Sequence, residues 1–143
     1  MTALGSTYTS KADGSDTRGA SVLVEEEFFG EPTPLHMHTD AEEAFYVLSG
    51  RAAVWLGDEE FEAHPGTFLL VPRGTRHALR RLTEEPGRML TLLSPPGLER
   101  FFEEVVRQGE DDLLADPERL GGLAAEYATE IHGDHPGAGT ADR

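Results

Sequence analysis

Apolar and polar residues alternate between about residue 20 and residue 95, in short runs that turn-forming residues separate. A period of two places successive side chains on opposite faces and is typical of a half-buried strand. Turn signals such as Gly57-Asp58 and Pro65-Gly66 lie between the runs. Short strands at this spacing favour an antiparallel sandwich or barrel. The predicted strands are Ser21–Phe29, Pro34–His38, Glu43–Leu48, Ala52–Leu56, Glu59–Ala63, Thr67–Val71, Arg76–Leu82 and Arg88–Leu93.

The period changes to a helical one after Pro95-Pro96-Gly97. Apolar residues recur at helical spacing from Leu98, which predicts an amphipathic helix over Leu98–Arg107. A second helix is expected after Asp116, a favourable N-cap, with Pro117 in the first helical position and an apolar stripe that reaches Ile131. We expect both helices to pack outside the barrel, on an outer face.

The two ends of the chain lack such periodicity. Residues 1–18 are rich in Ser, Thr, Gly and Asp, which predicts a flexible N-terminal arm or one exchanged between subunits. Residues 19–95 would form the barrel, residues 96–132 a helical segment, and residues 133–143 a disordered tail. The length of 143 residues suits one domain with one core, so the predicted fold is a single all-β domain with C-terminal helices.

The charge of the chain restricts its partners. The formal net charge is −15, which excludes a basic footprint for nucleic acid and opposes binding to anionic membranes. The sequence has no transmembrane-length apolar stretch and no apolar run after a basic start, so we expect a soluble, cytoplasmic protein. Because the chain has no cysteine, any metal must be held by nitrogen and oxygen.

Three histidines and a glutamate have the types and spacing of metal ligands. His36 and His38 are two apart on a predicted strand, so their imidazoles point to the same face. A turn follows, and the next strand can bring Glu43 back beside them; His77 begins a later strand. Glu42 is the alternative carboxylate, but it would shift the register by one and swap faces. Three imidazoles and one carboxylate suit one divalent transition metal ion: Fe, Mn, Ni, Co, Cu or Zn.

Glycines and a proline accompany these ligands at matching turns. The first block runs Gly30, five residues, His36, one residue, His38, four residues, Glu43, six residues, Gly50; the second runs Gly66, five residues, Pro72, one residue, Gly74, two residues, His77.

This two-part pattern resembles the cupin superfamily, whose motif it matches in nine of ten positions; Arg81 stands where an Asn is expected. The resemblance covers residues 20 to 95. It implies a jelly-roll β-barrel, with His36, His38, Glu43 and His77 as metal ligands and often a homodimer.

The Pro95–Phe102 stretch and the start of the last helix look like small single-domain bacterial cupins described as quercetinase-like. That resemblance implies a dioxygenase that acts on a flavonol-like or other enolic or aromatic small molecule, with Glu43 as a catalytic base as well as a ligand. Other small cupins look like metal-dependent cyclases or isomerases of polyketide pathways, which do not need O2, or bind a metal and a small molecule without turnover. The ligand set is compatible with all three functions.

A substrate pocket is expected beside the ligands. Phe45 and Val47 alternate with Glu43 and should face the same interior, while Trp55 could line the pocket or plug the barrel. Arg81 allows two interpretations. It either reaches the pocket and pairs with an anionic group, or the strand ends or bulges first and Arg81 is solvated or bridged to a surface carboxylate.

Overall fold

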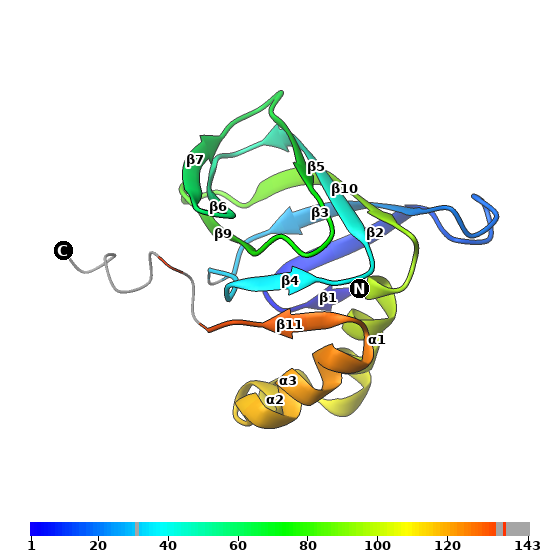
Figure 1. Cartoon of the computed structure of the whole chain (residues 1–143). Coiled ribbons are helices and arrows are strands. Elements are labelled where there is room, and N and C mark those ends of the chain that lie inside the picture. Colours follow the sequence, from blue (N-terminus) through cyan, green and yellow to red (C-terminus); the bar gives the residue numbers. More distant parts are fainter. Residues whose placement is uncertain (31, 134–135, 137–143) are drawn as a thin grey trace.

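Two antiparallel sheets pack face to face, and three helices lie beside them (Figure 1); this computed structural model of the chain describes residues 1–30, 32–133 and 136. The predicted all-β barrel with C-terminal helices is confirmed. The predicted tail over residues 133–143 lies for the most part outside the described residues.

The strands of the barrel follow the predicted alternation. The six-stranded sheet consists, in spatial order, of β1 (Thr2–Ala3), β2 (Ser6–Ala12), β3 (Val22–Phe28), β10 (Gly87–Ser94), β5 (Glu42–Ser49) and β8 (Phe68–Val71). The five-stranded sheet consists of β11 (Thr129–Ile131), β4 (His36–His38), β9 (His77–Arg81), β6 (Ala52–Leu56) and β7 (Glu59–Ala63). The eight predicted strands correspond to β3 through β10.

The N-terminal segment differs from the flexible arm expected over residues 1–18. Its β2 pairs antiparallel with β3 of the same chain, with Tyr8 opposite Glu26. The physical reason is that Thr and Tyr favour extended structure, and a strand at the edge region of a sheet does not need an apolar face to gain backbone hydrogen bonds. A composition rich in Ser and Thr therefore concealed a strand.

The helical segment contains one helix more than expected. Its helices are α1 (Leu98–Gln108), α2 (Glu110–Leu114) and α3 (Pro117–Glu126). The Asp116 side chain caps α3 by accepting a hydrogen bond from the backbone N–H of Arg119, as its position predicts. The expected helical stripe does not reach Ile131, because Ala128 has a φ of 52° and turns the chain into β11. Within the described residues, every helix is too short or too polar to cross a bilayer.

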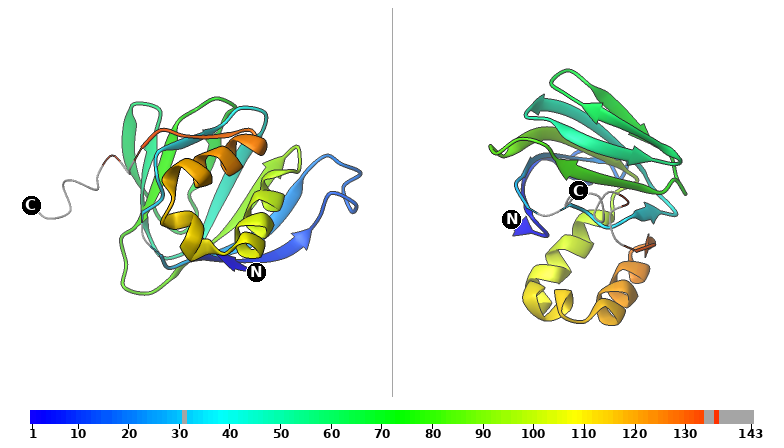
Figure 2. Two further views of the ribbon diagram at one scale, coloured as in Figure 1. Left: turned by 90° about the horizontal axis from the view of Figure 1, so that it is seen from below. Right: turned by 90° about the vertical axis from the view of Figure 1, so that its left-hand side faces the viewer.

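The helices cover the side of the sandwich where the two sheets part (Figures 1 and 2). They lie outside the barrel strands, but they contact the inner face of the six-stranded sheet rather than an outer face. Two apolar clusters result. The barrel core, between the sheets, contains Phe45, Val47, Val54, Ala63, Leu69, Val71 and Met89. The helix-side core, between that inner face and the helices, contains Val22, Val24, Leu93, Leu98, Phe101, Val105, Leu113, Leu123 and Ala124.

Replacing Leu113 by alanine tests whether the helices are integral to the domain. Leu113 is fully buried in the helix-side core, whereas its neighbour Leu114 is 53% exposed. We expect Leu113→Ala to lower the free energy of unfolding by about 3 kcal/mol in urea denaturation, because the cavity cannot close completely. Leu114→Ala, the matched control, should change it by less than about 0.5 kcal/mol. Equal stability of the two variants would contradict the packing described.

Candidate metal centre

Four side chains from three strands meet inside the barrel. His36 and His38 come from β4, His77 from β9 and Glu43 from β5, and His36 lies opposite His77 in the β4–β9 pair. The three histidines offer ring nitrogens that all lie within 4.8 Å of one another. The Glu43 Oε2 atom is 3.1 Å from Nε2 of His38 and 3.1 Å from Nε2 of His77. The structure therefore brings all four predicted ligands together.

Each of the three imidazoles is held from behind through its Nδ1 atom. The Nδ1 of His36 lies 2.7 Å from the Pro34 carbonyl oxygen, and that of His77 lies 3.0 Å from the Thr75 carbonyl oxygen. A carbonyl oxygen only accepts, so Nδ1 donates in both rings and Nε2 is the ring atom left to bind a cation, in His77 in place of its hydrogen bond to Glu43. A histidine that binds a metal usually donates its other ring N–H to such a partner, so the donor set fits a transition metal ion.

The hydrogen-bond partner of the His38 Nδ1 atom is a residue that the sequence did not suggest. Its Nδ1 lies 3.0 Å from Oγ1 of Thr129, and the Thr129 hydroxyl donates to the Tyr127 carbonyl at 3.2 Å. The hydroxyl therefore accepts from His38. Thr129 lies in β11, directly opposite His38 in the β4–β11 pair. No local pattern marks this short strand, because its position depends on where the helices end.

Glu43, not Glu42, is the inward carboxylate. Glu43 is 7% exposed, whereas the Glu42 side chain is 52% exposed and lies near Arg73. Alternation along β5 carries Phe45 and Val47 to the same inner face as Glu43. Both belong to the barrel core, so they form an apolar floor on one side of the ligands.

Burial and hydrogen bonding determine which side chains of the cluster are charged. Burial, followed by the charges of His77 and His38, lowers the pKa of His36 to about 3, so this ring is neutral at physiological pH. Burial alone would raise the pKa of Glu43, but its hydrogen bonds with His38 and His77 outweigh that effect and hold the pKa well below its usual range. Burial would lower the pKa of His77, but the hydrogen bond to Glu43 raises it above its ordinary value.

A second buried carboxyl lies in the same interior. Glu26 on β3 accepts hydrogen bonds from the hydroxyls of Ser6 at 2.8 Å and Thr91 at 3.1 Å. Burial raises its pKa to about 7, and the charge of Glu43 adds to the increase. The alternation of β3 carries the signal for this residue, because Glu26 occupies the same face as Val22 and Val24. Its inward position was not predicted, because Glu26 lies within three consecutive glutamates.

These groups form one layer across the interior, which we call the inner polar layer. It contains His36, Ser6, Glu26, His38, Glu43, His77, Thr91 and Thr129. Along β10, Met89 belongs to the barrel core, Thr91 to the polar layer and Leu93 to the helix-side core. The polar layer therefore lies between the two apolar clusters, where water is largely excluded.

Two residues expected in the pocket lie away from the ligands. Trp55 lies between Val54 and Leu56, which pack in and against the barrel core, so its side chain points to the outer face. Arg81 lies at the opposite end of β9 from His77. Its guanidinium donates to the backbone carbonyls of Phe29, Thr83 and Glu84. Arg81 is the last residue of β9 and does not reach the ligands; among the described residues its guanidinium binds backbone carbonyls rather than a surface carboxylate.

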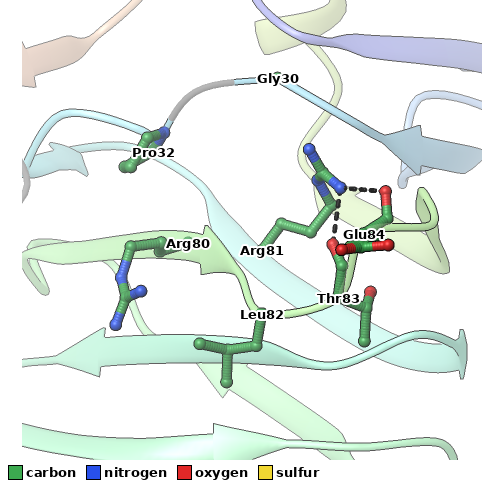
Figure 3. Close-up of a pocket in the computed structure, with 7 residues that line it drawn as sticks. All are labelled: Gly30, Pro32, Arg80, Arg81, Leu82, Thr83 and Glu84. Atoms are coloured by element: carbon green, nitrogen blue, oxygen red, sulfur yellow. Dashed lines mark hydrogen bonds between the residues drawn. The ribbon is translucent and has the colours of Figure 1, made fainter. Parts of the chain in front are cut away.

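Arg81 instead binds backbone carbonyls at the end of β9 that lies away from the ligands. In Figure 3 its guanidinium points toward Thr83 and Glu84, whereas Arg80 points in the opposite direction. Both line an open hollow of about 430 Å³ that contains none of the four ligands. The Asn expected from the motif is thus replaced by a residue that anchors the loop after β9.

A second hollow adjoins the metal ligands. It has a volume of about 250 Å³ and lies where three connections meet: β4 to β5, β10 to α1, and α3 to β11. Its lining consists of His38, Asp40, Ala41, Pro95, Pro96, Gly97, Leu98, Arg100, Glu126, Tyr127 and Ala128. Because His38 takes part in its wall, this hollow borders one of the four predicted ligands.

Comparison with known proteins matches residues 29–93 to the Cupin domain family. Quercetin 2,3-dioxygenase of Bacillus subtilis is 37% identical over 67 residues, which cover 47% of this chain and 20% of that protein. Polyketide synthase CurC of Streptomyces cyaneus is 38% identical over 66 residues, which cover 46% of this chain and 43% of that protein. The chain spans about half or less of the curated relatives that it matches.

The solved structures that resemble this chain have the same barrel. The polyketide cyclase RemF of Streptomyces resistomycificus is 28% identical, with a TM-score of 0.56, over 64% of this chain and 66% of that one.

Replacing Glu26 by glutamine should remove a pH dependence of stability in protein kept metal-free with a chelator. The folded state holds the Glu26 proton more tightly than the unfolded chain, because its pKa is about 7 rather than 4.5. The stability from this proton is complete below pH 4.5 and is lost as the pH rises through 7. Between pH 5 and pH 8, urea denaturation should show a fall in wild-type stability that exceeds the fall in Glu26→Gln by roughly 2 kcal/mol. An identical pH dependence in both proteins would contradict the burial of an ionisable Glu26.

Proposed function

We propose that the protein is a metal-dependent enzyme acting on a small enolic or aromatic molecule, with dioxygenation as its reaction; the match of residues 29–93 to the Cupin domain family supports this. One observation carries the proposal. Three imidazoles and one carboxylate converge inside the barrel, and each imidazole is oriented through Nδ1 by a second partner. A barrel that needed only a core would gain stability from apolar residues at these positions. We also propose that the protein forms a homodimer, as the family resemblance implies.

His36, His38, His77 and Glu43 would hold one divalent Fe, Mn, Ni, Co, Cu or Zn ion. When bound, such an ion supplies Lewis acidity toward an enolate or phenolate oxygen and, if redox-active, a means of activating O2. The protein contributes orientation: Thr129 and the two carbonyls hold the rings still. Glu43 stays ionised in this interior, so it can also accept a proton from a substrate hydroxyl.

The surroundings of the ligands favour a mainly apolar substrate with one acidic hydroxyl. Phe45 gives an apolar floor, and the hollow beside His38 offers a route from the surface. The similarity to a quercetin dioxygenase supports an enolic aromatic substrate of flavonol type. It does so over the barrel alone, since the match covers 20% of that enzyme.

A second candidate function is a metal-dependent cyclase or isomerase that uses no O2. The observation in its favour is the similarity to a polyketide cyclase and to a polyketide synthase, at identities of 28% and 38%, compared with 37% for the dioxygenase. The same four ligands would serve this chemistry with a metal that is not redox-active. A non-catalytic cupin that binds a metal and a small molecule is the third alternative.

The metal content of a histidine variant tests the ligand set. We expect elemental mass spectrometry of untagged wild-type protein to find close to one transition metal ion per chain, and His38→Ala to lose most of it, because three ligands bind far more weakly than four. His64→Ala is the control, since His64 is exposed and lies in a turn away from the cluster. Unchanged metal content in His38→Ala would remove His38 from the site, and a metal-free wild type under all loading conditions would refute the proposal.

Oxygen consumption distinguishes the candidate reactions. Wild-type protein loaded with Fe, Mn, Ni or Co should consume O2 with quercetin or a related enol, as measured with an oxygen electrode. Glu43→Gln should reduce turnover by at least about 10²-fold, because general base catalysis contributes 10²–10⁴-fold. Turnover of an enolic polyketide analogue under strict anaerobiosis would favour the cyclase, and binding without turnover under either condition would favour the binding protein.

A further inference from the structure

Glu26 is a buried acid whose hydrogen-bond partners among the described residues are hydroxyl groups. The hydroxyls of Ser6 and Thr91 reach one carboxyl oxygen each, at 2.8 and 3.1 Å. The Tyr8 side chain also interacts with this carboxyl. A hydrogen-bonding role alone would be served by a glutamine, so an ionisable group at this depth needs a different explanation.

The charged neighbour of this acid is the ligand carboxylate. Glu26 on β3 and Glu43 on β5 lie on either side of β10. Burial raises the pKa of Glu26 and of Tyr8, and the charge of Glu43 adds to both increases. Two carboxylates in one water-poor interior repel each other strongly. In a protein without a bound cation, the repulsion is relieved because Glu26 keeps its proton. A divalent cation between the three imidazoles and Glu43 would be the largest local charge in this interior and would favour the ionised form of Glu26.

A divalent ion together with its four proposed ligands would carry a net charge of one positive unit. Three neutral imidazoles add no charge, and Glu43 cancels one of the two charges of a divalent ion. A net charge inside a low-dielectric interior is costly unless it is balanced. Glu26 belongs to the same inner polar layer as the ligands, and its hydroxyl partners are already placed to donate to a carboxylate.

We propose that Glu26 is the outer counter-charge of the metal centre: it gives up its proton when the divalent ion binds and balances the charge that the ligands leave. The inference rests on the proposed metal centre and adds a residue to it. The balance is simple. One divalent ion enters, the protons that Nε2 of His38 and His77 donate to Glu43 leave to solvent together with the Glu26 proton, and the Glu26 carboxylate keeps the hydrogen bonds from Ser6 and Thr91. Glu26 acts through the field at the ion and is therefore a positioning residue, not a catalytic one.

The test is a titration with Co²⁺, whose visible absorption reports binding without any enzyme assay. Dissociation constants are measured at pH 6 and pH 8 for the wild type and for Glu26→Gln, which keeps the size and hydrogen-bonding capacity of the side chain. Proton release is measured at pH 6 by calorimetry in buffers of different ionisation enthalpy. Glu27→Gln is the matched control, since Glu27 is the next residue of β3 but is exposed on the opposite face.

We expect Glu26→Gln to bind Co²⁺ about 10-fold or more weakly at pH 8, in the range found for outer-shell partners of metal ligands. At pH 6, where Glu26 is protonated in most molecules, the variant should release nearly one proton fewer per Co²⁺ than the wild type. Glu27→Gln should match the wild type in both measurements, and Glu26→Asp, which keeps the charge, should retain the proton release.

Wild-type proton release in Glu26→Gln would overturn this inference, whether or not the affinity changes. Circular dichroism and a thermal melt establish that the variant folds, and Glu26→Asp provides the second readout if it does not. Absence of Co²⁺ binding in the wild type is a separate outcome, because it would refute the proposed metal centre itself.

Discussion

The hydrogen bonds between one buried carboxylate and two imidazoles determine how the interior of this protein is organised. Glu43 lies 3.1 Å from Nε2 of both His38 and His77, with little access to water. Such groups are stable at this depth only if each remaining donor and acceptor is also satisfied. The interior therefore has a polar layer that runs across it, with an apolar cluster on either side, and not a uniform apolar core.

This requirement links the C-terminal segment to the barrel. The rear nitrogen of His38 needs an acceptor, and Thr129 supplies it from β11. That strand reaches its place because α1, α2 and α3 carry the chain from the end of β10 across to the edge of the other sheet (Figure 1). The helices cover an apolar face and, by the same path, complete the surroundings of a ligand.

The sequence allowed the barrel strands and the four ligands to be predicted because both depend on short-range patterns. Alternation decides which face a residue occupies, so His36, His38 and Glu43 could be assigned to the interior before their neighbours were known. The features that were missed depend on partners far along the chain. Thr129 has no local pattern and acquires its role only through pairing with β4.

Two further misjudgements have the same physical origin. Strand β2 contains few apolar residues, and its stability comes from pairing with β3, which composition does not reveal. Arg81 follows the alternation, yet the strand is long enough to carry it to the far end of the barrel, where backbone carbonyls bind it. Glu26 is different, because its inward position could be predicted from the alternation and was concealed only by its two outward neighbours.

The position of β11 also has a consequence for biosynthesis. The ligands His36, His38, Glu43 and His77 leave the ribosome well before Thr129, since synthesis proceeds from the N-terminus. A nascent chain can pair β4 with β9 while the His38 ring still lacks its acceptor. The cluster therefore reaches its final geometry only after residue 131 has emerged, because the residue that orients His38 is synthesised after all four ligands.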